Sequence, residues 1–217
     1  MPRDNSPKER QNRQLERKKS RRASRDRILI VSEGSRTRPL YFNEIRSTYR
    51  LHSANVVVLP STLGTSPKQV VESAVEEFQK ARAFEQVYAV FDLDAHVNYY
   101  DALNNAMEFN GKLRNDLRQP VCFRAVASVP DFELWLLLHY EDIQVPIHRN
   151  DVLQRLKKHI PNYEKGASGV FSKTRPNLET AIQRAERLAL INNAHTDPEP
   201  YTAIVDLVKL LTGLKSP

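Results

Sequence analysis

Four short runs of apolar residues, separated by segments with helical spacing, dominate the first two thirds of the chain. The runs cover residues 27–32, 54–60, 86–92 and 121–129. They are continuous rather than alternating, which is typical of strands buried on both faces. The segments between them predict helices at 39–50, 67–82 and 99–117, with Ser66 as the N-cap of the second. This alternation predicts parallel βαβ units in one sheet.

The strand pattern stops after the fourth run. Residues 131–142 predict a strongly apolar helix, and three further helices are expected at 150–159, 175–192 and 199–213. The expected fold is therefore α/β, with a mainly parallel four-stranded sheet flanked by helices and followed by C-terminal helices. We expect a core at 27–142 and a helical extension at 143–217 that packs on it.

Charge is distributed unevenly along the chain. The net charge is +7, and residues 1–27 hold 11 Lys/Arg against four Asp/Glu, which leaves 22 of each sign for the other 190 residues. The tail at 1–26 has almost no apolar side chains, so we expect it to be disordered when free. A basic arm is attracted to nucleic-acid phosphates, or it is only a solubilising extension. The candidate phosphate contacts in the tail are Lys18, Lys19, Arg21 and Arg22.

The sequence contains no signal that would take the chain to a membrane or out of the cell. No apolar stretch follows the N-terminal charges, as a secretory signal requires. None approaches the roughly 20 apolar residues of a membrane span. These observations predict a cytoplasmic protein.

Acidic side chains follow three of the predicted strands. Glu33 follows the first strand, Asp92 and Asp94 the third, and Asp131 and Glu133 come shortly after the fourth. Ligands of open parallel sheets collect at this carboxyl edge. Asp92 and Asp94 share one face and repel each other unless a cation lies between them. An oxygen-rich site suits Mg²⁺ or Mn²⁺, although acids at strand ends can also be simple helix caps.

Several segments resemble a known family. ILIVSEGSRTRPLYF and VFDLDAH are similar to the two acidic motifs of Toprim domains. SVPDFELWLLLHYED, the Tyr163-x-Lys165-Gly166 stretch and DPEPYTAIVDLVKLL resemble the RloB-like family (RloB/AbiLii), over roughly residues 27–214. This resemblance implies a Toprim-type core in a bacterial antiphage-defence protein, and a divalent-metal-dependent nuclease that cleaves phosphodiester bonds.

The resemblance also implies roles for particular residues. Glu33 would be a general acid or base and a metal ligand, Asp92 and Asp94 metal ligands, and Glu133 an additional ligand. Lys165 would stabilise charge on the phosphate. Many RloB-like sequences continue the first motif with Thr-Glu, whereas this chain has Arg38 after Thr37. A cation there suits a phosphate, so Arg36 and Arg38 are candidate phosphate contacts.

Two other functions fit parts of the pattern. One is a non-catalytic module of a defence system that binds nucleic acid or a partner protein. The other is a haloacid-dehalogenase-type phosphatase, whose Asp-x-Asp motif normally lies on the first strand, not the third. The chain has no G-x-x-x-x-G-K-[ST] motif, so a nucleotide-driven step would need a separately encoded partner ATPase.

Overall fold

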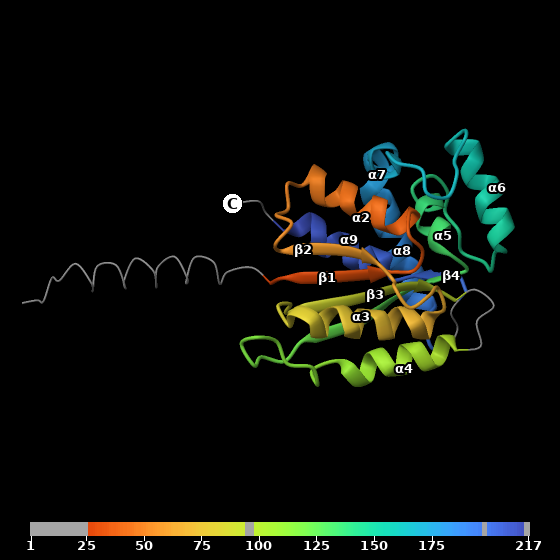
Figure 1. Ribbon diagram of the computed structural model, residues 1–217. Coiled ribbons are helices and arrows are strands. Elements are labelled where there is room, and N and C mark those ends of the chain that lie inside the picture. Colours follow the sequence, from red (N-terminus) through yellow and green to blue (C-terminus); the bar gives the residue numbers. More distant parts are fainter. Residues whose placement is uncertain (1–25, 94–97, 197–198, 215–217) are drawn as a thin grey trace, which may run out of the picture.

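The computed structural model describes residues 26–93, 98–196 and 199–214, and contains a five-stranded sheet of order β2-β1-β3-β4-β5 (Figure 1). The strands are β1 (Ile28–Ser32), β2 (Val56–Pro60), β3 (Gln86–Asp92), β4 (Cys122–Val129) and β5 (Tyr201–Thr202). The first four are parallel, as predicted. β5 pairs antiparallel with the end of β4, Thr202 opposite Ser128. The predicted α/β class is confirmed, with one short strand more than expected.

Helices cover both faces of the sheet. They are α2 (Thr37–Thr48), α3 (Pro67–Ala81), α4 (Tyr99–Phe109), α5 (Phe132–Leu137), α6 (Arg149–His159), α7 (Val170–Thr174), the 3₁₀ turn η1 (Arg175–Asn177), α8 (Leu178–Ile191) and α9 (Ile204–Gly213). Alternate residues of β1 enter two separate hydrophobic clusters: Ile28 and Ile30 face α2 and α9, whereas Leu29 and Val31 face α3 and α4 (Figure 1). Burial on both faces explains the continuous apolar runs.

Several predicted helices are shorter than expected, two of them at their carboxyl ends by five residues or more. The helix expected at 99–117 ends at Phe109, because the Asn110 side chain accepts a hydrogen bond from the Phe123 N–H and Gly111 takes a φ of +73°. The helix expected at 131–142 ends at Leu137. There the N–H groups of His139 and Tyr140 bond to the carbonyls of Leu136 and Leu137, three residues back, which tightens the chain into a turn.

The start of α3 follows the sequence pattern, but the C-terminal segment follows it only in part: the helix expected at 199–213 begins at Ile204, after the short strand β5, and α7 was not expected. Ser66 is the N-cap of α3, as predicted, and it forms a reciprocal capping box with Gln69. β5 joins the sheet. One hydrophobic cluster contains side chains of both the predicted core and the C-terminal segment, among them Ile28 and Leu211. The 27–142 and 143–217 boundaries remain a prediction. Within the described residues, no helix is long and apolar enough to cross a bilayer.

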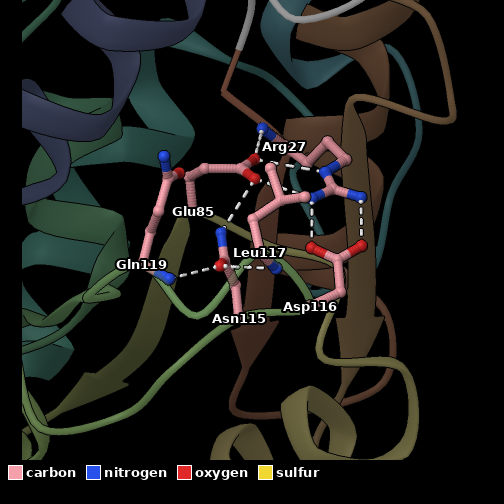
Figure 2. A network of polar contacts seen from close by, with 6 residues as sticks. All are labelled: Arg27, Glu85, Asn115, Asp116, Leu117 and Gln119. Carbon is pink, nitrogen blue, oxygen red and sulfur yellow. Dashed lines mark hydrogen bonds and ion pairs between the residues drawn. The ribbon is translucent and has the colours of Figure 1, made fainter.

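A polar network closes the amino edge of the sheet (Figure 2). The Arg27 guanidinium donates to Glu85 at 2.7 Å and to Asp116 at 2.8 and 3.0 Å. Asn115 donates to Glu85 at 3.1 Å, and its side-chain oxygen accepts from the backbone N–H groups of Leu117 and Gln119. The network fastens the loop after α4 to the start of β1, at the edge opposite the predicted site.

Candidate functional site

The first half of the site is built where β1 passes into α2. Gly34 takes a φ of +70° after Glu33, a backbone conformation that suits glycine. The Glu33 carboxylate accepts a hydrogen bond from the Asp92 N–H at 3.1 Å, which ties the ends of β1 and β3 together. Arg38, in the first turn of α2, is turned inward and only 7% exposed.

Arg38 lies between Glu33 and Asp92, two of the predicted acids. Its Nη1 donates to the Glu33 carbonyl at 3.1 Å, and its Nη2 forms an ion pair with Asp92 and lies 3.6 Å from the Glu33 carboxylate. The guanidinium also lies over the Phe132 ring, 5.6 Å from its centroid. Among the described residues, an arginine of the chain itself thus supplies positive charge to Glu33 and Asp92.

The second half of the site lies at the start of α5. Asp131 and Glu133 are each 2% exposed. Glu133 accepts a hydrogen bond from the Tyr163 hydroxyl at 3.0 Å and lies 3.2 Å from the Lys165 ammonium. Lys165 is also 3.7 Å from Asp131 and is half exposed, so it borders the cluster on the solvent side. Asp131 occupies the N-cap position of α5, yet its side chain makes no capping hydrogen bond.

The four carboxylates interact strongly through their charges. Burial raises the pKa of Asp92 to about 6, because the stabilising charge of Arg38 only partly offsets it and Glu33 adds repulsion. Burial, together with the charges of Glu133 and Asp92, raises the pKa of Asp131 to about 8. In Arg38, burial is outweighed by Asp92 and Glu33, which raise the pKa of the guanidinium. The cluster is short of positive charge.

The donor set fits a divalent cation in its chemistry. Every donor is a carboxylate oxygen, and Asp92 Oδ1 and Asp131 Oδ1 are buried without a hydrogen-bond partner among the described residues. Among the described residues, the acids Glu33, Asp92, Asp131 and Glu133 pair with two cations, Arg38 and Lys165. In the part of the chain that the structure describes, however, no three His, Cys, Asp or Glu side chains are grouped closely enough to hold a metal. Coordination therefore requires a further ligand or a rearrangement.

The structure brings together part of the predicted set. Glu33, Asp92, Glu133, Lys165 and Arg38 gather at the carboxyl edge of the sheet. Arg36 is exposed, and its side chain lies close to Gly166. A side chain at position 166 would crowd it, because an added Cβ would lie 3.0 Å from the Arg36 Cβ. The remaining predicted residues, Asp94, Lys18, Lys19, Arg21 and Arg22, lie outside the described residues.

Two site residues were not assigned a role from the sequence. Asp131 is in the cluster, although only Glu133 of this segment was predicted as a ligand. Tyr163 belongs to the Tyr163-x-Lys165-Gly166 stretch, and this spacing places both its hydroxyl and the Lys165 ammonium on Glu133. The signal that could have identified Tyr163 was its position two residues before a candidate site lysine.

The fold and this site together define a class of α/β protein in which buried carboxylates, an internal arginine and a rim lysine meet at the carboxyl edge of a parallel sheet. Residues 28–211 match the family described as RloB-like protein. The chain therefore belongs to the RloB-like family, as its motifs predicted, and this membership suggests a defence-associated protein. Comparison with curated proteins and with solved structures gives no match.

Proposed function

We propose that the protein is a Toprim-type nuclease of a defence system that uses Mg²⁺ or Mn²⁺ to cleave phosphodiester bonds in nucleic acid. The observation that supports this most is the convergence of Glu33, Asp92, Asp131 and Glu133. These acids come from separate segments and lie together at the edge where parallel sheets bind ligands. Perturbed carboxylates of this kind are typical of functional sites.

Particular residues of the cluster would hold the metal. Asp92 and Asp131 have the buried free oxygens, and Glu33, Glu133 and Asp94 remain candidate ligands. A bound divalent cation would polarise the phosphoryl group and favour ionisation of an attacking water.

The side chains at the rim would position the substrate. Lys165, half exposed beside Glu133, would contact a phosphate oxygen and offset its charge. Arg36, exposed at the start of α2, would hold a neighbouring phosphate. Glu33, fixed by the Asp92 N–H, would accept or donate a proton. In this proposal the basic tail binds nucleic-acid phosphates, and a separately encoded ATPase drives any nucleotide-dependent step. The protein would act in the cytoplasm.

The test is cleavage of end-labelled single- and double-stranded DNA and RNA by the full chain with Mn²⁺, Mg²⁺ or EDTA. We expect metal-dependent cleavage that Asp92→Asn and Asp131→Asn each reduce by about 10²-fold or more. Asp206→Asn is the matched control, because Asp206 is exposed and borders Gln86 and Cys122 at the other end of the sheet. Binding of the substrates without cleavage in any metal would replace the nuclease by a nucleic-acid-binding module.

A further inference from the structure

Arg38 holds the position that a metal would need between Glu33 and Asp92. Its guanidinium contacts the Glu33 carbonyl and forms an ion pair with Asp92, and the side chain is 7% exposed. Its Nε is buried and has no partner among the described residues, so the guanidinium is held from one side only. The contacts that hold Arg38 are therefore mainly electrostatic, together with the face of Phe132.

Arg38 offsets charge that would otherwise destabilise the apo chain. Asp92 is 6% exposed and repelled by Glu33 and Glu133, so without a counter-charge it could stay ionised only at high cost. Lys165 does not replace Arg38, because its ammonium lies on Asp131 and Glu133. Glu33 and Asp92 thus depend on Arg38 whenever no metal is bound.

A divalent cation on Asp92 would meet this guanidinium directly. Arg38 is bound to Asp92 Oδ2, and the free oxygen is Oδ1 of the same carboxylate. Two positive groups that share one buried carboxylate repel each other strongly, because water is excluded and screening is weak. Either cation satisfies Asp92, and each weakens the binding of the other.

We propose that Arg38 is an internal counter-cation that competes with a divalent metal for Asp92, so that withdrawal of its guanidinium accompanies metal binding and Arg38 sets the metal affinity of the chain. This inference deepens the proposed function and rests on it for the identity of the ligand. It also accounts for a cluster that has carboxylate donors, yet whose described side chains are not grouped closely enough to hold a metal.

The test measures Mn²⁺ binding to the full chain. Electron paramagnetic resonance reports the concentration of free Mn²⁺, and thermal unfolding reports the stabilisation by bound Mn²⁺. We expect Arg38→Gln to lower the Mn²⁺ Kd by roughly tenfold or more, within the ~5–150-fold range of coupled sites. Arg38→Lys keeps the charge and should bind Mn²⁺ much as the wild type does. Arg46→Gln is the matched control: it removes the same charge from α2, but its guanidinium donates to the Val56 carbonyl at 3.2 Å, not to the cluster.

A second variant keeps the test decisive if Arg38→Gln folds poorly. In Arg38→Gln/Asp92→Asn both partners are removed, so the protein should fold without metal and gain no Mn²⁺ affinity. If Arg38→Gln alone unfolds in EDTA, Mn²⁺ should restore its folding. Failure of Mn²⁺ to do so, or an Arg38→Gln Kd equal to or weaker than that of the wild type, would overturn the inference.

The outcomes separate this inference from the nuclease proposal. Wild type that cleaves nucleic acid with Mn²⁺, combined with an unchanged Kd in Arg38→Gln, rejects only the competition. Wild type that cleaves nothing, combined with tighter Mn²⁺ binding in Arg38→Gln, upholds the competition and rejects the nuclease.

Discussion

Replacing Tyr41 with Phe would remove one hydroxyl from the core and leave the aromatic packing in place. The Trp135 indole N–H donates to this hydroxyl at 2.7 Å, and both side chains are buried. The Tyr41 ring meets Phe132 and Phe171 edge to face at 5.3 and 5.5 Å, contacts that Phe would keep. Tyr41→Phe therefore leaves a buried N–H unpaired, which costs about 1–3 kcal/mol. For a chain of this size, each kcal/mol corresponds to roughly 2–4 °C in Tm.

Urea unfolding followed by tryptophan fluorescence measures this cost at the perturbed residue, because Trp135 is the single tryptophan of the chain. The midpoint should fall while the m-value stays unchanged. Tyr99→Phe is the matched control, since the Tyr99 hydroxyl is buried and has no partner among the described residues. Its removal should be neutral or slightly stabilising. Equal losses in the two variants, or a Tyr41→Phe loss below about 0.5 kcal/mol, would refute the hydrogen-bond argument.

Three further predictions concern stability. Burial lowers the pKa of His139 to about 4 in the native chain. As the pH falls below about 6.5, His139 therefore becomes protonated in the unfolded chain but stays neutral in the native chain. Lowering the pH from 8 to 5 should therefore cost the wild type about 2 kcal/mol that His139→Phe does not lose, as urea unfolding at both pH values will measure. Arg27→Ala should lower the free energy of unfolding by about 1 kcal/mol at low salt and by less near 1 M NaCl, because the ion pairs of Arg27 are partly exposed and salt screens them. An equal loss of stability at both salt concentrations would point to packing instead. Ser66→Ala should lower the stability by about 1 kcal/mol through loss of the α3 cap, and Ser66→Asn should largely restore it.

Four strands and the gathering of acids at one edge of the sheet could be predicted from the sequence, because both depend on local patterns. Continuous apolar runs marked β1 to β4, and the acids that follow strand ends marked the edge where Glu33, Asp92 and Glu133 gather. β5 could not be predicted, since two residues form no pattern and Tyr201–Thr202 pairs with Ser128 and Val129, which lie far away in the sequence. The length of α4 was predictable in principle, because Asn110 and Gly111 are turn residues within the segment expected to be helical.

The pairing inside the site could not be predicted from spacing. Arg38 and Asp92 are 54 positions apart, and their contact depends on the first turn of α2 facing the end of β3. A sequence pattern places both residues at one edge without fixing which side chain turns inward. An exposed Arg38 at the same position would have suited a phosphate, whereas the buried Arg38 is bound to carboxylates. The prediction that Arg38 contacts phosphate remains untested.

The charged groups at the two edges of the sheet differ in a way that supports the proposed site at the carboxyl edge. At the amino edge Arg27 also faces two acids, but there its hydrogen bonds lower the pKa of Asp116 and, against the effect of burial, that of Glu85 (Figure 2). Those acids are at their most stable when ionised and paired, as in a structural network. At the carboxyl edge, burial raises the pKa of Asp92 and Asp131 despite the nearby cations. Ionised carboxylates are therefore costly at the carboxyl edge, where the proposed cation would offset their charge, whereas at the amino edge Arg27 already does so.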